Sequence, residues 1–274
     1  MTNEVSFPDS VVVVRNVQFG TGGGRPLHMD VLRPRTRRAA QEPVLVWVHG
    51  GWWRRGASWP APAHLAALVE QDYFVCSVEY RLSDEAKFPA QIEDVKCAIR
   101  YLRAHASRYG IDPNRIGVWG SSAGGHLAAL AGTSGDVPEL EGTGGWQEQS
   151  SRVQAAVDWY GPTDIADGDA HAAPDSHGSL LIGGPVLENL DMAAKVNPIT
   201  YISDKTPPML IMHGTQDTAV LPSQSELLYE ALQRAKVPSE LVMVPGKGHE
   251  YLGDDAIEKV HTFLAKILKP AGVR

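Results

Sequence analysis

Apolar and polar positions along the chain follow two successive patterns. The first two apolar runs, 11–19 and 27–32, have the length of strands and flank the glycine cluster 22–24, so they predict an antiparallel hairpin. From residue 44 onward, short apolar runs typical of buried strands alternate with longer segments of helical periodicity. The pattern predicts further strands at 44–48, 73–78, 115–119, 153–159, 209–212 and 240–244, and helices at 61–69, 88–108, 223–235 and 254–268.

This order of elements predicts an α/β fold. An antiparallel hairpin followed by alternating strands and helices gives a mostly parallel central sheet with helices on both faces. Right-handed crossovers place the carboxyl ends of the parallel strands, and the loops that follow them, along one edge of the sheet. We expect residues 1–274 to form one domain. Within it, the irregular segment 161–204, rich in Gly, Asp, Pro and His, is expected to be an insertion that serves as a partial lid or pocket wall.

Composition narrows the partners that the protein can have. The chain has 274 residues, and its 25 Lys+Arg against 32 Asp+Glu give a net charge of -7, which argues against binding to nucleic acid or to anionic membranes. Its apolar runs are of strand length, so no membrane span is expected, and its first residues lack the features of a signal peptide. With Cys76 and Cys97 expected as buried free thiols, a cytoplasmic location is predicted.

The most specific motif is Gly-x-Ser-x-Gly at residues 120–124. It lies between the strand-like run 115–119 and the helix-like run 125–131, the arrangement of a nucleophile elbow. In such an elbow the serine sits on a sharp turn, and small residues on both sides let the backbone fold back without a Cβ collision. Ser122 has a glycine two residues before it and two residues after it, whereas Ser121 does not. Ser122 is therefore the predicted nucleophile.

An activated serine also needs a base, and the base needs an acid that orients it. In a fold of this kind both should follow the serine, first the acid and then the histidine, each on a loop after a strand. Asp217 follows the strand-like run 209–212, and His249 follows the next strand, so these two residues meet the requirement. Asp164, which follows an earlier strand, is the rival acid; the number of strands after Ser122 favours Asp217.

Stabilising the oxyanion of an acyl-transfer intermediate requires two backbone donors. One is expected at Ala123, directly after the serine, and the other at Gly50 or Gly51, in the loop after strand 44–48. Trp52 and Trp53 come next in this loop, and we expect one to pack into the protein and the other to line the substrate pocket. The candidate pocket residues are Trp52, Trp53, Tyr160 and Val220.

Other titratable residues are expected to have structural roles. His126, one helical turn after the serine, fits a buried and hydrogen-bonded residue better than a second base, and His213 is expected to support the loop of the acid. Glu79 and Arg81 are expected to form an ion pair. No metal site is predicted, because the acidic residues and histidines of 161–204 lack a recognised ligand spacing. These residues are Asp167, Asp169, His171, Asp175 and His177.

Further motifs accompany the predicted site. They are His49-Gly50-Gly51, Tyr80-Arg81-Leu82, Phe88-Pro89-Ala90 with Asp94, Asp112-Pro113-Asn114-Arg115-Ile116, Gly125-His126-Leu127-Ala128, Tyr160-Gly161-Pro162-Thr163-Asp164, His213-Gly214 and Gly248-His249. On these motifs, from about residue 44 to the C-terminus, the chain resembles the α/β-hydrolase serine esterases of the hormone-sensitive-lipase-like and bacterial feruloyl-esterase-like groups. It is also similar to kynurenine formamidases. The resemblance implies hydrolysis of carboxylic esters without a cofactor, and it supports the triad and the oxyanion donors named above.

The chain departs from the family pattern in two places. Trp52 stands where the usual His-Gly-Gly-Gly pattern has its third glycine. The N-terminal segment has the pattern of strands rather than of a helical cap, which implies a more open site.

These observations predict a serine carboxylesterase that hydrolyses small or aryl esters through an acyl-enzyme. An aryl formamidase is the alternative, and it would prefer N-formylkynurenine to aryl esters. A non-catalytic binding protein on a hydrolase scaffold is a more distant alternative, which the presence of His249 argues against. The expected partner is a small-molecule ester, and a homodimer is compatible with the exposed sheet edges and C-terminal helices of such folds.

Overall fold

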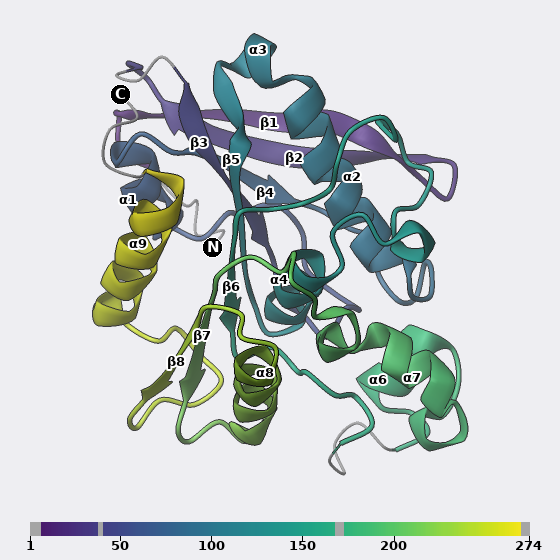
Figure 1. The fold of residues 1–274 in the computed structure, drawn as a ribbon. Coiled ribbons are helices and arrows are strands. Elements are labelled where there is room, and N and C mark those ends of the chain that lie inside the picture. The colour runs from purple at the N-terminus through teal and green to yellow at the C-terminus, as the bar shows by residue number, and fades with distance from the viewer. Residues whose placement is uncertain (1–6, 38–40, 168–172, 270–274) are drawn as a thin grey trace, which may run out of the picture.

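One mixed sheet of eight strands forms the centre of the computed structural model, which describes residues 7–37, 41–167 and 173–269 (Figure 1). The strand order is β1-β2-β4-β3-β5-β6-β7-β8. β2 pairs antiparallel with both β1 and β4, and the other neighbouring pairs are parallel. The strands are β1 (Val11–Gly22), β2 (Arg25–Pro34), β3 (Glu42–Val48), β4 (Phe74–Val78), β5 (Ile111–Ser121), β6 (Ala155–Trp159), β7 (Met209–Gly214) and β8 (Ser239–Val244).

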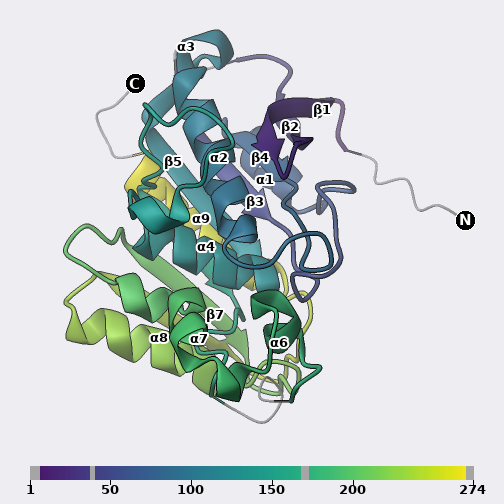
Figure 2. The ribbon, with the colours of Figure 1, turned by 90° about the vertical axis from the view of Figure 1, so that its right-hand side faces the viewer.

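Helices cover both faces of the sheet. Buried side chains of α2, α4 and α8 belong to one apolar cluster, and those of α1 and α9 belong to a second cluster. Figures 1 and 2 show α9 on the opposite side of the strands from α2 and α4. The predicted α/β-hydrolase architecture, with its parallel sheet and N-terminal hairpin, is therefore confirmed. The helices are α1 (Leu65–Glu70), α2 (Ala90–Ala104), α3 (Ala106–Tyr109), α4 (Ala123–Thr133), α8 (Ser223–Arg234) and α9 (Asp254–Leu268).

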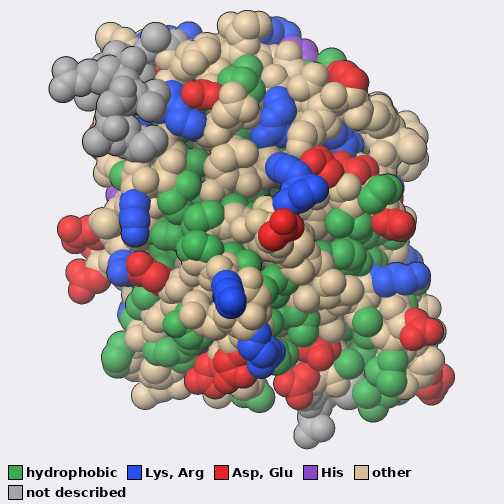
Figure 3. All heavy atoms as spheres, in the orientation of Figure 1, with side chains coloured by type: hydrophobic (Ala, Val, Ile, Leu, Met, Phe, Trp, Pro, Cys, Tyr) green, Lys and Arg blue, Asp and Glu red, His purple; other side chains and the backbone are tan. Residues whose placement is uncertain are grey.

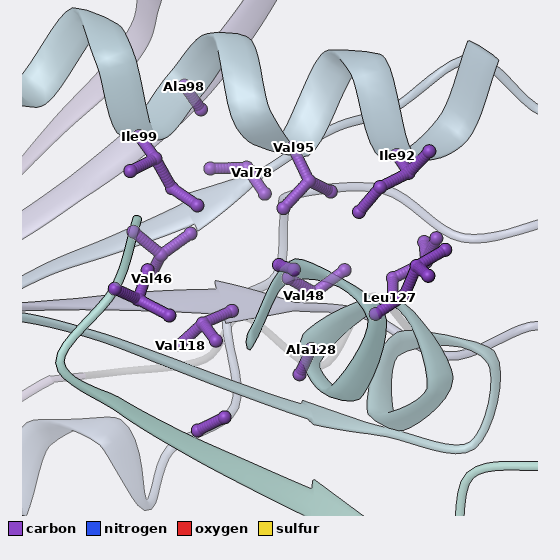
Figure 4. Packing of buried hydrophobic residues seen from close by; sticks show 14 of the residues in the cluster. Val46, Val48, Val78, Ile92, Val95, Ala98, Ile99, Val118, Leu127 and Ala128 are labelled. Atoms are coloured by element: carbon purple, nitrogen blue, oxygen red, sulfur yellow. The ribbon is translucent and has the colours of Figure 1, made fainter. Parts of the chain in front are cut away.

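Burial on both faces explains why the central strands are apolar throughout rather than alternating. Every residue of β3 is buried, and successive side chains point to opposite faces of the sheet. Val46 and Val48 therefore lie in the cluster with α2 and α4, while Leu45 and Trp47 lie in the cluster with α1 and α9. Figure 4 shows the first of these clusters, with strand residues Val46, Val48, Val78 and Val118 facing Ile92, Val95, Ala98 and Ile99 of α2 and Leu127 and Ala128 of α4.

The local predictions hold with some differences in length. Gly23 and Gly24 form the turn of the β1–β2 hairpin with φ of 58° and 84°. The helix expected at 88–108 is divided at His105 into α2 and α3, and α3 ends at Gly110, which adopts the left-handed conformation. The helix expected at 61–69 begins only at Leu65. The residues before it form turns closed by hydrogen bonds between residues i and i+3, such as the bond from the Leu65 N–H to the Pro62 carbonyl.

The two cysteines are buried free thiols, as expected. The predicted ion pair between Glu79 and Arg81 is wrong. Glu79 pairs with Arg25 at 3.1 Å, and Arg81 pairs with Asp94 of α2 at 2.8 Å. Each charge meets a partner from another element: Arg25 of β2 reaches Glu79, and both the N–H and the guanidinium of Arg81 bond to Asp94 of α2.

The segment expected to be irregular, 161–204, contains short helical pieces. They are α6 (His177–Ile182), η2 (Val186–Glu188), α7 (Leu190–Val196) and η3 (Pro198–Tyr201). Each is too short to show helical periodicity in the sequence, and their stability comes from packing. Figure 1 shows α6 and α7 to the right of α8, in the lower part of the molecule. The end of α7 contacts the core, because the Val196 carbonyl lies 2.9 Å from Nε2 of His126.

The distribution of surface charge and the apolar character of the helices bear on the partners that the protein could bind. Acidic and basic side chains are interspersed on the face shown in Figure 3. Among the helices in the described ranges, none combines the length and apolar character needed to cross a bilayer.

Candidate active site

Ser122 occupies the sharp turn between β5 and α4. Its backbone has φ of 55° and ψ of -125°, a conformation that costs a non-glycine residue on the order of 1–3 kcal/mol. The turn is held by a 2.8 Å hydrogen bond from the Ser122 N–H to the carbonyl of Trp159 at the end of β6. A Cβ at Gly120 would lie 2.1 Å from the Gly124 carbonyl oxygen, and a Cβ at Gly124 would lie 2.1 Å from the Val48 carbonyl oxygen. Both glycines of the motif are therefore required by backbone contacts.

A continuous chain of hydrogen bonds joins Ser122, His249 and Asp217. Nε2 of His249 lies 2.9 Å from Oγ of Ser122, and Nδ1 of His249 lies 2.7 Å from Oδ2 of Asp217. Because a carboxylate can only accept, Nδ1 carries the proton, and in the neutral ring Nε2 is the acceptor for the serine hydroxyl. The three side chains come from loops after β5, β7 and β8, at the carboxyl edge of the sheet.

Asp217 is buried and held by several donors. Its Oδ1 accepts from the N–H groups of Ala219 at 2.9 Å and Val220 at 3.0 Å, and Nε2 of His213 lies 3.2 Å from its Oδ2. Burial acts to raise the pKa of Asp217, but the hydrogen bonds from His213, His249 and Val220 outweigh it and lower this pKa below the ordinary value. Asp217 is thus ionised and fixed in place.

The rival acid, Asp164, has different partners. Its Oδ1 accepts from the side-chain amide of Asn197 at 2.7 Å and from the Ala166 N–H at 2.9 Å. Asp164 therefore organises the start of the segment 161–204, while the acid that contacts His249 is Asp217.

The loop after β3 lies directly against the serine. A Cβ at Gly50 would meet the Ser121 carbonyl oxygen at 2.8 Å and the Ser122 Cβ at 3.2 Å, so this backbone passes the nucleophile as closely as glycine allows. Within the described part of the chain, no hydrogen bond uses the N–H groups of Gly50, Gly51 or Ala123. These three N–H groups remain the predicted donors to an oxyanion.

The two tryptophans of this loop have different environments. Trp53 is fully buried, and its indole N–H donates a 3.1 Å hydrogen bond to Nδ1 of His126. Nε2 of His126 lies 2.9 Å from the Val196 carbonyl, so it carries the proton, and both ring nitrogens are satisfied. Trp53 is therefore a structural residue. Its prediction as a residue that lines the substrate pocket is wrong, because no part of its side chain is exposed. His126 is a buried, hydrogen-bonded residue, as expected.

Trp52 faces the site. Its φ of 59° lies in the left-handed region, which accounts for the glycine in the related pattern at this position. Its ring is stacked on His177 of α6, with centroids 4.9 Å apart. It is also nearly parallel to the ring of His249, at 6.0 Å. This contact with His177 was not predicted, because no local sequence signal joins two residues so distant along the chain.

The remaining pocket candidates border the catalytic histidine and the acid. The Tyr160 ring lies 4.7 Å from the His249 ring, and burial raises the pKa of Tyr160 to about 12. Val220 is buried in the acid loop, where its carbonyl lies 2.9 Å from Nε2 of His213. His213 thus contacts the acid and its loop, as expected. Whether Tyr160 and Val220 touch substrate stays a prediction.

Two members of the acidic and histidine run, Asp169 and His171, lie outside the described residues. Among the residues that are described, no group of three or more His, Cys, Asp or Glu side chains is arranged to hold a metal ion.

The fold and this constellation define an α/β-hydrolase, the class of the structures that superpose on it. The chain belongs to the BD-FAE family, whose model matches residues 29–232. It is 32% identical over 251 residues to the probable carboxylic ester hydrolase LipM of Mycobacterium tuberculosis, covering 88% of this chain and 57% of that protein. The chain thus spans just over half the length of the curated relatives it matches first.

Two solved structures cover nearly the whole chain. The truncated form of a carbohydrate esterase from gut microbiota superposes with a TM-score of 0.86 at 30% identity, covering 93% of this chain and 95% of that one. The butyrate-bound esterase Est2 of Thermogutta terrifontis superposes with a TM-score of 0.76 at 26% identity, covering 96% and 97% of the two chains.

Proposed function

We propose that this protein is a serine carboxylesterase in which Ser122, His249 and Asp217 form the catalytic triad. The observation that carries the proposal is the hydrogen-bonded chain from the serine hydroxyl through the imidazole to the buried carboxylate, with distances of 2.9 Å and 2.7 Å. The names of the relatives, which are esterases and ester hydrolases, support the same reaction.

The reaction follows from this geometry. As the Ser122 oxygen bonds to the ester carbonyl carbon, its proton passes to Nε2 of His249, and Asp217 stabilises the resulting imidazolium. The carbonyl oxygen becomes an oxyanion next to the N–H groups of Ala123 and of Gly50 or Gly51. Nε2 then gives the proton to the departing alcohol oxygen and leaves an acyl-enzyme. Water, deprotonated by the same nitrogen, releases the acid and restores Ser122.

We infer a small or aryl ester as the substrate. The neighbours are described as a carbohydrate esterase and as an esterase holding butyrate, which supports a short acyl group. Trp52 and the segment 161–204, which contributes His177, form a wall of the proposed pocket. A cytoplasmic location and a homodimer remain predictions from the sequence.

The test compares two neighbouring serines. Ser122→Ala should lower kcat on p-nitrophenyl acetate or butyrate by at least about a thousandfold, and a fluorophosphonate probe should label the wild type but not this variant. Ser121→Ala is the matched control, and it should keep most of the activity. Retention of a tenth of wild-type activity by Ser122→Ala would overturn the assignment, and a higher kcat/KM on N-formylkynurenine than on aryl esters would favour a formamidase.

A further inference from the structure

A cationic and aromatic corner borders the proposed catalytic site. Trp52 and His177 form its aromatic wall, with ring centroids 4.9 Å apart and planes 23° apart. Arg55 follows Trp52 on the loop after β3. Its side chain begins close to the Gly51 backbone, because a Cβ at Gly51 would lie 3.1 Å from the Arg55 Cγ. Its side chain is exposed, so it is available to a bound molecule at the edge of the oxyanion loop.

Arg55 differs from the arginine beside it. Nε of Arg54 is paired with the Asp84 carboxylate at 2.9 Å. In the described ranges of the chain, no carboxylate lies within ion-pair distance of Arg55. Both arginines act on His177, since burial and then the two positive charges lower the pKa of this histidine. Counting described residues alone, the corner therefore holds one cation in excess, in a protein whose net charge is -7.

The position of the corner relates it to one half of the substrate. In the proposed reaction His249 delivers a proton to the departing alcohol, so the alcohol portion of the ester must lie beside this imidazole. The Trp52 ring lies 6.0 Å from the His249 ring, with 18° between their planes, and His177 contacts Trp52. The aromatic wall thus borders the space that the alcohol portion would fill.

We propose that Trp52, His177 and Arg55 form a subsite for the alcohol portion of the ester, and that this subsite selects a ring bearing a carboxylate. The aromatic wall contacts the ring, and the Arg55 guanidinium pairs with the carboxylate, for which its planar fork of N–H donors is suited. The proposal rests on the proposed esterase function and adds the substrate class to it. A carboxylated phenol and a uronic-acid sugar share this chemistry.

The activity test compares esters that carry a carboxylate with neutral counterparts of similar size. 4-Carboxyphenyl acetate is compared with 4-carbamoylphenyl acetate, and an acetylated methyl glucuronoside with the corresponding glucoside. Arg55→Gln should lower the kcat/KM preference for the charged ester about fivefold, mainly through KM, because a partly exposed pair contributes at this level. Arg55→Lys should keep part of the preference, and Arg54→Gln is the matched control that should keep it. The pair of esters that shows the effect identifies an aryl or a sugar alcohol as the source of the ring.

A binding test separates this subsite from the esterase function itself. Titration calorimetry with 4-hydroxybenzoate, the charged product, should show tighter binding than with 4-hydroxybenzamide, and Arg55→Gln should remove the difference. Equal preference in wild type and Arg55→Gln, in both activity and binding, would overturn the subsite. If charge-selective binding persists while no ester is hydrolysed and Ser122 is not labelled, the subsite stands and the esterase function fails.

Discussion

Nε2 of His213 lies 3.2 Å from Oδ2 of Asp217, the carboxylate oxygen that also faces the His249 ring. The same nitrogen lies 2.9 Å from the Val220 carbonyl. Both neighbours are acceptors, so Nε2 must carry the proton, and Nδ1 then accepts from the Ser225 hydroxyl at 2.7 Å. A second histidine, from the end of β7, thereby positions the acid of the proposed triad.

His213→Phe keeps an aromatic ring, although a larger one, and removes this hydrogen bond to a charged group, which contributes about 1.5–3 kcal/mol. We expect kcat/KM on p-nitrophenyl acetate to fall about tenfold or more. Ser225→Ala is the control: it removes the partner of Nδ1 but leaves the bond to Asp217, so a smaller loss is expected. Steady-state kinetics on variants whose thermal melts show a folded protein measure both effects. Equal losses in the two variants would show that His213 acts through packing alone.

We expect the buried carboxyl group of Asp158 to make the stability of the folded protein depend on pH. It is buried at the end of β6; its Oδ1 accepts from the Gly161 N–H at 2.8 Å, and its Oδ2 has no hydrogen-bond partner among the described residues. Burial raises its pKa from 3.8 to about 6. Between these two values the folded protein keeps a proton that the unfolded chain has lost, so the contribution of Asp158 to stability falls as the pH rises through this window.

Asp158→Asn should abolish this loss. At pH 8 the variant should be more stable than the wild type by about 1–3 kcal/mol. The raised pKa of Asp158 alone corresponds to about 3 kcal/mol, and an unpaired amide in the variant would offset part of this gain. At pH 4 the two proteins should be similar. Urea unfolding at both pH values measures the difference. A variant that is less stable at pH 8 would show that the charged form of Asp158 is stabilised by groups beyond Gly161.

What could be predicted from the sequence depends on how local the physical cause is. The elbow at Ser122 follows from two glycines within two residues, and its partners follow from the order of strands, so the fold and the meeting of Ser122, Asp217 and His249 were foreseeable. The stack of Trp52 on His177 and the pairing of Arg81 with Asp94 depend on side chains from distant elements. The short helices of 161–204 are held by tertiary packing, which leaves no periodic pattern in the sequence.

Two glycine substitutions test whether the turn at Ser122 requires glycine at position 120. Gly120→Ala would place a Cβ 2.1 Å from the Gly124 carbonyl oxygen, a collision that only backbone movement at the nucleophile can relieve. We expect loss of most esterase activity and a destabilisation of more than about 2 kcal/mol. Gly24→Ala is the control, since a Cβ there meets no atom within 4 Å although φ is +84°; about 1 kcal/mol and full activity are expected. Steady-state kinetics and urea unfolding measure the two effects. Full activity in Gly120→Ala would contradict the requirement for glycine at position 120.

Trp52→Gly restores the glycine of the related pattern and tests what the tryptophan does. At φ of 59° glycine is unstrained, so the loop should keep its course while the ring between His177 and His249 is lost. Because the Trp52 ring is proposed to contact a ring of the alcohol portion, kcat/KM for 1-naphthyl acetate relative to ethyl acetate should fall about tenfold, a typical effect of a lost apolar contact. Trp52→Phe keeps a smaller ring, so an intermediate ratio is expected from it. An unchanged ratio in Trp52→Gly, with p-nitrophenyl acetate still hydrolysed, would place the bulky alcohol on another side of the site.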